Sequence, residues 1–364
     1  TFRLLDTPPM TAAENMALDE ALLELKGRGR TPNTIRFLQF SPRAILVGFH
    51  QSIAEEVRAE YCRDHGIQIN RRVTGGGAIF FDESQLGWEV ICDKGFFDLG
   101  FVNDRLFKML CEPVVTALDR WGLEASFRPR NDIEIAGRKI SGTGGTESEG
   151  AFLFQGTMLV DFDVDTMLRA LRIPVEKLKA KEIDSVRQRV TCLRWDLGRV
   201  PPLEEIKEAI RSGFEKRLRI KLEPGGLSGE EENLFRENLE YFESDEWIDG
   251  VRPAFQRTRT VQAAYKAEAG MVRFTLVVNP EQKRLKDLYI TGDFLSFPTR
   301  ALYDLQSALR GMPLDRDPIR ARVKEFFDQK RIRIPGMTCG DFLKPLDHAF
   351  EKIGMARFGI PLEY

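Results

Sequence analysis

The chain has 364 residues, 30% of them charged, and a formal net charge of −2 at pH 7. A chain of this length is longer than most domains built on a single hydrophobic core, so we expect two domains. The nearly balanced charge gives no bulk attraction to nucleic acid or to an anionic membrane, and no run approaches the ~20 apolar residues of a membrane span.

Cysteine and histidine usage narrows the chemistry further. The five cysteines lack CxxC spacing and are odd in number. Neither a disulfide framework nor a zinc site is therefore indicated, and a reducing cytoplasm is the simplest location. The three histidines are too few and too dispersed for a histidine-based metal site.

The N-terminal segments are expected to form a helix and then strands. Thr11 and Glu14 have capping-box spacing, and apolar residues then recur at helical spacing until Gly27. We interpret this helix as packing core. Alternation of apolar and polar residues predicts strands over 34–40 and 44–48.

Segment 71–82 contains two arginines, a threonine and three consecutive glycines between two apolar runs, which are predicted to be partner strands. Glycine permits a positive φ and lets a ligand approach the backbone closely. An arginine beside such a turn can hold a carboxylate or phosphate through two parallel hydrogen bonds. For the glycines alone, a simple hairpin with solvated arginines is the more common alternative.

Segment 131–142 alternates as a strand through Ile133 and Ile135, turns at 136–137, and then presents Lys139. Lys139 stands between apolar and small residues rather than in a run of charges. It is either a surface lysine or a point charge directed into a pocket. The neighbouring Arg138 is interpreted as facing solvent.

The rest of the chain changes composition once. The stretch 224–229, rich in glycine and serine, is the clearest linker, and an acidic helix over 230–243 follows it. The further predicted strands span 86–92, 152–160, 261–265, 270–278 and 285–291, and the further predicted helices span 103–118, 204–218, 299–309, 319–329 and 342–353.

Taken together, these segments resemble the lipoate–protein ligase family of the biotin/lipoate ligase superfamily. Segment 71–82 looks like the family's RRxxGGGAxxxD element, and 131–142 looks like its ND…G+K(I/V)SG element. Segment 155–159 resembles its HGTLL strand, 177–190 its KLxxKxIxSVRxRV segment, and 15–23 its first helix. Five matches in the same order are far more specific than a glycine triplet alone.

The resemblance implies an α/β (α+β) fold: a biotin/lipoate-ligase-like mixed sheet flanked by helices, plus a small C-terminal α/β accessory domain. With the change of composition, it places a catalytic adenylating domain at 1–225, a linker and acidic helix at 226–246, and the accessory domain at 247–364. Segment 292–294, Gly-Asp-Phe, resembles a turn of that accessory domain.

The implied activity is ATP-dependent ligation of lipoate or octanoate to an acceptor lysine of a lipoyl-domain carrier protein, through an acyl-adenylate such as lipoyl-AMP. Lys139 is then the expected catalytic residue, and Lys179 and Lys181 belong to a loop over the adenylate. Mg²⁺ is expected with the ATP phosphates, and Asp132 is a candidate ligand. The expected substrate- and adenylate-binding residues are Arg72, Thr74, Gly75, Gly76, Gly77, Ala78, Phe81, Asn131, Asp132, Ile140, Ser141, Gly142, Gln155, Gly156 and Thr157.

Two positions depart from the family pattern. Phe81 and Gln155 stand where the relatives usually carry histidine. Both positions are expected near the acyl or adenylate site. We therefore expect a different acyl length or acceptor preference.

Two alternatives to the ligase remain open. Octanoyl and lipoyl transferases of the same fold move the acyl group through a cysteine thioester instead of ATP. Their nucleophile lies before the lysine element or after the HG strand, but 123–142 and 171–175 contain no cysteine here. The other alternative is a non-catalytic protein that binds acyl-adenylate or a lipoyl protein. The sequence does not fix the oligomeric state.

Overall fold

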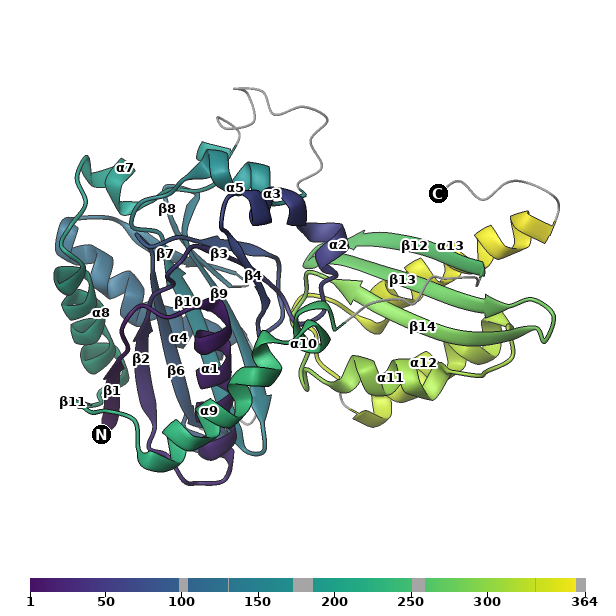
Figure 1. Cartoon of the computed structure of the whole chain (residues 1–364), viewed down its shortest axis with the longest axis horizontal. Coiled ribbons are helices and arrows are strands. Elements are labelled where there is room, and N and C mark those ends of the chain that lie inside the picture. The colour runs from purple at the N-terminus through teal and green to yellow at the C-terminus, as the bar shows by residue number, and fades with distance from the viewer. Residues whose placement is uncertain (98–103, 130, 173–185, 251–258, 331, 358–364) are drawn as a thin grey trace. The chain divides into compact units, whose positions relative to one another are not determined.

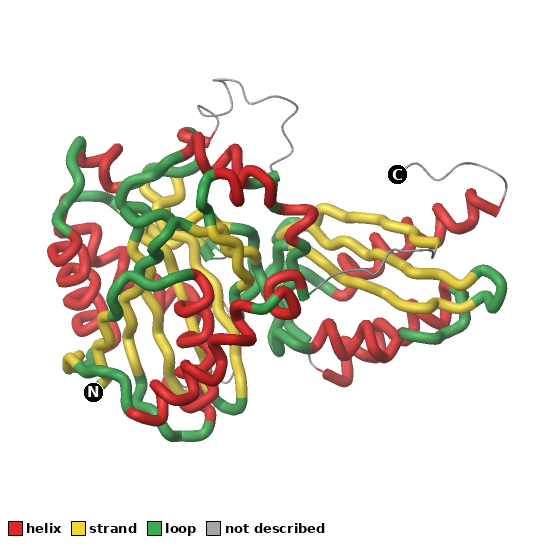
Figure 2. The backbone as a smooth tube through the Cα atoms, viewed as in Figure 1, coloured by secondary structure: helices red, strands yellow, loops and turns green. Residues whose placement is uncertain are grey.

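The computed structural model describes residues 1–97, 104–129, 131–172, 186–250, 259–330 and 332–357. The chain forms two compact units. Unit 1 comprises Thr1–Val47, Ile53–Thr74 and Ala78–Ile248, and unit 2 comprises Gly48–Ser52, Gly75–Gly77 and Asp249–Tyr364. Figure 1 labels their elements, and Figure 2 distinguishes helices from strands.

The described part of unit 1 is built on an eight-stranded mixed sheet in the order β11-β1-β2-β6-β10-β9-β8-β7. β1 is parallel to β2 and β11, and the other neighbours are antiparallel. The strands are β1 (Phe2–Asp6), β2 (Thr34–Leu38), β6 (Leu86–Asp93), β7 (Ala125–Arg128), β8 (Asp132–Ile135), β9 (Arg138–Ser148), β10 (Ala151–Met158) and β11 (Leu222–Pro224). The helices are α1 (Ala12–Gly27), α2 (Ile53–Glu56), α3 (Ala59–Asp64), α4 (Asp104–Leu118), α5 (Val164–Ala170), α7 (Leu193–Leu197), α8 (Leu203–Leu218), α9 (Gly229–Glu243) and α10 (Asp245–Asp249).

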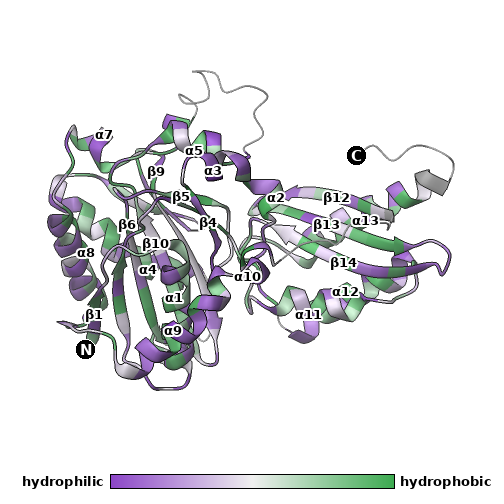
Figure 3. Ribbon diagram, in the orientation of Figure 1, coloured by the Kyte–Doolittle hydropathy of each residue, from purple (hydrophilic) through white to green (hydrophobic). Residues whose placement is uncertain are grey.

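Different helices cover the two faces of this sheet (Figure 1). Leu153 of β10 clusters with Leu18 and Leu22 of α1. The next residue, Phe154, contacts Phe107 of α4, with ring centroids 5.0 Å apart, because successive side chains of a strand point to opposite faces. α8 packs on α4, and α9 packs on α1. Figure 3 shows the difference in polarity, since α9 is largely hydrophilic and the strands carry long hydrophobic stretches.

The start of α1 is as predicted. The Thr11 hydroxyl accepts a hydrogen bond from the Glu14 amide at 3.2 Å, and the Glu14 carboxylate accepts one from the Thr11 amide at 2.8 Å. Both donors would otherwise be unsatisfied at the helix N-terminus. The helix ends at Gly27, also as predicted.

α9 lies in the stretch expected to be a linker with an acidic helix, and it is part of unit 1. A second capping box, between Ser228 and Glu231, begins it. The Glu231 carboxylate also forms an ion pair with Arg3 of β1 at 2.7 Å, and both side chains are nearly inaccessible to solvent. The acidic helix is thus fixed to the sheet by a buried ion pair as well as by packing on α1.

A second, three-stranded sheet corrects one prediction. It has the order β4-β3-β5, from β4 (Gln68–Arg71), β3 (Ala44–Val47) and β5 (Ile79–Phe81). The two strands that flank the glycine triplet were expected to pair with each other, but β3 lies between them, parallel to β4 and antiparallel to β5. The glycine segment is therefore a crossover connection and not a hairpin turn.

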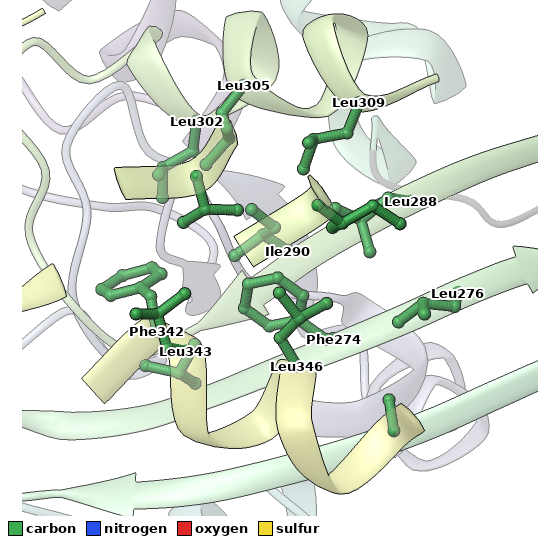
Figure 4. Packing of buried hydrophobic residues seen from close by; sticks show 14 of the residues in the cluster. Phe274, Leu276, Leu288, Ile290, Leu302, Leu305, Leu309, Phe342, Leu343 and Leu346 are labelled. Carbon is green, nitrogen blue, oxygen red and sulfur yellow. The ribbon is translucent and has the colours of Figure 1, made fainter. Parts of the chain in front are cut away.

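Unit 2 contains a three-stranded antiparallel sheet packed on three helices. The elements are β12 (Arg259–Ala267), β13 (Gly270–Asn279), β14 (Arg284–Gly292), α11 (Ala301–Leu309), α12 (Arg316–Lys330) and α13 (Cys339–Arg357). Phe274 and Ile290 of the strands, Leu302 of α11 and Phe342 of α13 meet in one apolar core (Figure 4). The predicted fold class, an α/β (α+β) protein with a mixed sheet flanked by helices, is confirmed.

No helix in the described ranges has both the length and the apolar character needed to cross a lipid bilayer.

Candidate functional site

Arg72, at the start of the glycine segment, lies beside the carboxyl end of β3. The Arg72 amide donates to the Val47 carbonyl at 2.9 Å, and the Arg72 guanidinium donates to the Leu46 carbonyl at 2.7 Å. Gly76 has a φ of 99°, in the region that favours glycine. The backbone can therefore turn sharply at Gly76.

The absence of a side chain at Gly75 has a packing reason within unit 2. A Cβ at Gly75 would lie 2.5 Å from the Phe294 carbonyl oxygen. The same oxygen accepts a hydrogen bond from the Gly76 amide at 2.9 Å. The structure thus explains Gly75 by contact with Phe294, and the expected approach of Gly75, Gly76 and Gly77 to an adenylate stays a prediction.

The two arginines of the segment have different roles in the chain. Arg71 is buried, and its guanidinium donates to the carbonyls of Trp247, at 3.2 Å, and Ile248, at 3.0 Å, both in α10. Arg72 is also buried, which lowers its pKa to about 10. Arg72 therefore still carries a positive charge at neutral pH, as an anion site requires.

Lys139 forms an ion pair with Asp132, with Nζ 2.7 Å from Oδ1. The lysine side chain is 33% exposed, so it is neither fully in solvent nor buried. The lysine side chain lies over Gly142, because a Cβ added at Gly142 would be only 2.6 Å from Lys139 Nζ. Asp132 also accepts a hydrogen bond from Arg128 at 2.6 Å, which raises the pKa of that arginine. The Asp132 carboxylate thus has two cations beside it, Lys139 and Arg128.

Arg138 does not face open solvent, which corrects its interpretation from the sequence. Its guanidinium donates to Asp196 at 2.7 Å and to the Thr191 hydroxyl at 3.1 Å. The neighbouring backbone is also fixed, because the Lys139 amide donates to the Arg189 carbonyl and the Thr191 amide donates to the Lys139 carbonyl, both at 2.8 Å. The end of the 177–190 segment therefore lies beside Lys139. Lys179 and Lys181 lie outside the described residues.

The Asp132 carboxylate does not fit a metal ligand in this arrangement. Its two oxygens are held by Lys139 and Arg128. In the described ranges, no group of three or more His, Cys, Asp or Glu side chains is placed to hold a metal ion. Asn131, the other polar residue expected here, donates to the Thr143 carbonyl at 2.8 Å and so fixes β9.

Hydrogen bonds join β10 to the other two motifs. The Thr74 hydroxyl donates to Gln155 Oε1 at 2.5 Å, and the Gly142 amide donates to the Thr157 hydroxyl at 3.2 Å. Within unit 1, the structure therefore brings Thr74 and Gly142 to β10, although these residues are distant in sequence.

Other expected site residues belong to the apolar interior. Phe81 is buried with its ring centroid 4.6 Å from that of Phe40, and Ala78 packs against the cluster around Ile45. Ile140 and Ser141 are fully buried, and the Ser141 hydroxyl has no hydrogen-bond partner among the described residues. For Phe81, packing against Phe40 is a sufficient reason for an aromatic side chain at this position.

Gly156 is constrained by Trp88, its partner on β6. A Cβ at Gly156 would overlap the indole ring, which is fully buried. We expect Gly156→Ala to lower the free energy of unfolding by about 1–3 kcal/mol, the usual cost of overpacking a core. Gly226→Ala is the matched control, because no atom lies within 4 Å of its Cβ. Urea unfolding of both variants measures the effect, and equal stability of the two would contradict the packing role.

The sequence analysis missed a buried polar cluster on the α1 face of the sheet. Arg36 of β2 lies 2.5 Å from Asp19 of α1 and 3.3 Å from Glu89 of β6, and all three side chains are fully buried. Gln155 donates to Glu89 at 3.1 Å. The sequence did contain a signal for this cluster. Arg36 and Glu89 each lie inside an otherwise apolar strand, and Asp19 lies on the apolar side of its helix.

The five cysteines are all unpaired thiols. Cys62, Cys92, Cys111 and Cys192 are buried, and burial raises the pKa of each thiol, to about 11 for Cys62 and Cys192 and to about 12 for Cys92. Burial likewise raises the pKa of Cys111, whose thiol contacts Thr143, and that of the partly exposed Cys339. A nucleophilic cysteine instead needs a lowered pKa and access to substrate.

Comparison with known proteins gives consistent matches. A model of the family described as "Lipoyl protein ligase A/B catalytic domain" matches residues 11–215. The octanoyltransferase LipM of Brevibacillus brevis is 30% identical over an alignment of 271 residues that covers 68% of this chain and 98% of the relative. The lipoate-protein ligase A subunit 1 of Thermoplasma acidophilum is 32% identical over 259 residues, 68% of this chain and 95% of the relative.

Solved structures agree. A bi-partite lipoate protein ligase from T. acidophilum, studied with its E2 lipoyl domain, has a TM-score of 0.61 at 30% identity and covers 70% of this chain and 99% of its own. A lipoate-protein ligase A bound with ATP has a TM-score of 0.60 at 28% identity, over 69% of this chain and 99% of its own. LipL1 of Plasmodium falciparum, at 18% identity, shares the fold with a TM-score of 0.70 over 91% of this chain and 98% of its own. The chain therefore belongs to the lipoyl protein ligase A/B catalytic domain family, which includes lipoate–protein ligases and octanoyltransferases.

Proposed function

We propose that the chain is an ATP-dependent lipoate–protein ligase that acylates a lysine of a lipoyl-domain protein through an acyl-adenylate. In the first step, a carboxylate oxygen of lipoate or octanoate attacks the α-phosphorus of ATP, and pyrophosphate leaves. In the second step, the ε-amine of the acceptor lysine attacks the acyl carbonyl carbon, AMP leaves, and the amine loses a proton. Neither step needs a covalent bond to the enzyme.

The burial of the cysteines carries this proposal. The family contains two chemistries, and only the thioester route requires a reactive thiol. Each of the five thiols has a raised pKa, and four are fully buried. An adenylate route makes no such demand and is therefore the better fit to this chain.

The cations of the site support the same chemistry. Bringing an acyl carboxylate to the α-phosphate requires positive charge that is already oriented. Lys139 is partly exposed and is held in place by Asp132. We propose that its ammonium offsets the charge shared by the carboxylate and the phosphate, and that the buried cation Arg72 contributes to the same field. Thr74, Gln155 and Thr157 would then bind substrate or adenylate.

The names of relatives provide the partner and substrate classes. One similar structure is of a lipoate protein ligase with its E2 lipoyl domain, and another contains bound ATP. By this similarity, we propose a lipoyl-domain acceptor and ATP for this chain. Mg²⁺ would then enter with the ATP phosphates, because it is usually held by phosphates and water with few protein carboxylates. The engagement of Asp132 with two cations argues against a role in holding it.

The C-terminal residues are proposed to act as an accessory domain. The family match ends at residue 215, whereas the C-terminal segment of unit 2 begins at Asp249. The Thermoplasma enzyme is described as bi-partite. We propose that residues 1–225 catalyse adenylation and that 226–246 are attached to them. We further propose that 247–364 form an accessory domain in this chain that corresponds to the second part of the bi-partite enzyme.

The unpaired thiols also favour a reducing cytoplasm as the location of the protein.

An octanoyltransferase is the second candidate, and the names of several relatives favour it. The two functions differ in what they consume. A ligase releases pyrophosphate only when lipoate or octanoate is present with ATP. A transferase moves octanoate from an acylated carrier protein without ATP. Mass spectrometry of a lipoyl domain, incubated with each set of substrates, distinguishes them.

We expect that replacing any one of the five cysteines by alanine leaves ATP-dependent acylation intact. The reason is that no thiol takes part in the proposed reaction. Acylated lipoyl domain is measured by mass spectrometry, with the melting temperature of each variant as the control for folding. Cys111 is the most informative position, since its thiol lies next to Thr143. A variant that keeps its melting temperature but loses acyl transfer would identify a nucleophile and favour the transferase.

A further inference from the structure

A row of polar side chains crosses the apolar sheet of unit 1. In the strand register, Arg36 of β2 is directly opposite Glu89 of β6, and Glu89 is directly opposite Gln155 of β10. Directly paired residues of antiparallel strands point to the same face. Asp19 of α1, which covers this face, completes the group. The row runs from the centre of the core to the residue that contacts Thr74.

The charges of this row balance only if it retains one proton. Asp19 and Glu89 are fully buried carboxyl groups beside a single guanidinium, Arg36. Burial raises the pKa of both, and the interaction between the two carboxyl groups raises that of Asp19 further. Since two close groups titrate together, these raised pKa values favour a pair that shares one proton opposite Arg36, which also balances the charge. Loss of either carboxyl group still leaves the other to neutralise the arginine.

Gln155 has two partners that fix which way its amide points. Its Nε2 donates to Glu89 Oε1 at 3.1 Å, and its Oε1 accepts from the Thr74 hydroxyl at 2.5 Å. Glu89 accepts with both oxygens, from Arg36 at Oε2 and from Gln155 at Oε1, so it acts as the carboxylate of the pair. A carboxylate can only accept, so it selects the NH₂ side of the amide. The oxygen of Gln155 must then face Thr74. The direction of the Thr74 hydroxyl is thereby determined by a carboxylate on another strand.

We propose that Glu89 is a positioning residue that acts through Gln155 on Thr74, the residue before the glycine triplet. Asp19, although it shares the same arginine, does not contact Gln155 and has no such role. The inference rests on the proposed function in one respect, which is that Thr74 and Gln155 belong to the substrate site.

Two isosteric substitutions separate positioning from simple structural support. In Glu89→Gln, the new amide must present its oxygen to Arg36 and its NH₂ group to Gln155. Gln155 then turns over and presents NH₂ to Thr74, which reverses the hydrogen bonds. In Asp19→Asn, an uncharged amide replaces the carboxyl group that shares a proton with Glu89. Glu89 then stays ionised, because it alone neutralises Arg36, and its hydrogen bond to Gln155 is kept. We expect Glu89→Gln to lower kcat/KM for lipoate adenylation about tenfold, the value of one hydrogen bond, and Asp19→Asn to change it little.

The experiment measures pyrophosphate release and the melting temperature of both variants. Equal losses of activity in the two variants, or no loss in Glu89→Gln, would overturn the inference, because a structural cluster is indifferent to which carboxyl group is removed. If Glu89→Gln does not fold, Thr74→Val tests the far end of the same chain. It removes only the hydroxyl and is expected to show a similar loss, and normal activity in it would also overturn the inference.

A second measurement does not depend on enzymatic activity. The side-chain NH₂ signals of Gln155 can be followed by NMR with ¹⁵N-glutamine labelling and identified by their absence in Gln155→Met. We expect them to shift in Glu89→Gln and to stay in place in Asp19→Asn. Should the wild-type chain release no pyrophosphate with lipoate or octanoate, the proposed function fails, and these signals still test the role of Glu89. Unchanged signals in Glu89→Gln would refute it.

Discussion

Replacing Lys139 by alanine is expected to lower the rate of acyl-adenylate formation by roughly a hundred- to a thousandfold, the usual value of one preorganised charge. The ammonium would act mainly on charge that develops in the transition state, so the loss is expected in kcat. The measurement is pyrophosphate release with saturating ATP and lipoate.

The fold should tolerate this change. The Lys139 side chain is 33% exposed, and its partner Asp132 keeps the ion pair with Arg128 when the lysine is removed. No buried charge is therefore left alone. Lys139→Arg is expected to restore only part of the activity, since a planar guanidinium does not reproduce a compact ammonium.

Lys207→Ala is the matched control for Lys139→Ala. Lys207 forms a lysine–aspartate pair with Asp6, at 2.8 Å, on α8 and β1. Lys207→Ala should keep its activity and lose little stability, because an ion pair with an exposed partner contributes little to the free energy of unfolding. Near-normal adenylation by Lys139→Ala would remove the central residue of the mechanism. A large fall in its melting temperature would show that Lys139 is structural.

Replacing Arg36 by methionine is expected to be the most destabilising of the substitutions considered, by about 3–5 kcal/mol at pH 8. The variant keeps the side-chain volume but leaves two buried carboxyl groups, Asp19 and Glu89, without their cation. Urea unfolding at several pH values measures the change.

The loss should shrink as the pH falls. Burial already raises the pKa of Asp19 and Glu89 above their ordinary values in the folded wild-type chain, and removing Arg36 raises them further. A raised folded-state pKa means that the folded state holds its protons more tightly than the unfolded state does. Its stability is complete below the unfolded-state pKa and decreases as the pH rises through the folded-state value. Arg36→Met should therefore approach the wild type near pH 5.

Two further variants check this explanation. Adding Asp19→Asn to Arg36→Met should recover part of the stability at pH 8, because one ionisable group is removed. Arg236→Met, which breaks an exposed ion pair with Glu232, should change stability by less than about 0.5 kcal/mol. A loss in Arg36→Met that did not vary with pH would point to packing rather than charge.

Local patterns in the sequence were sufficient to predict much of this protein. The capping residues Thr11 and Glu14 define the start of α1, because a helix N-terminus needs acceptors for its first amides. The apolar periodicities predicted most strands and helices, and the ordered motifs around Arg72, Lys139 and Gln155 predicted the family. Each of these features depends on residues that are close together in the chain or on motifs read in order.

Only the tertiary structure decided how those segments pack. β3 lies between the two strands that flank the glycine triplet, since strand order depends on long-range pairing that local alternation does not specify. Phe81 is part of a core that the three-dimensional fold assembles. Gly75 lacks a side chain because the carbonyl of Phe294, more than two hundred residues away, occupies that space. The row from Asp19 to Thr74 joins one helix, three strands and a loop. It could not be predicted from the sequence, because these residues become partners only when folding buries them together and a buried charge requires a partner.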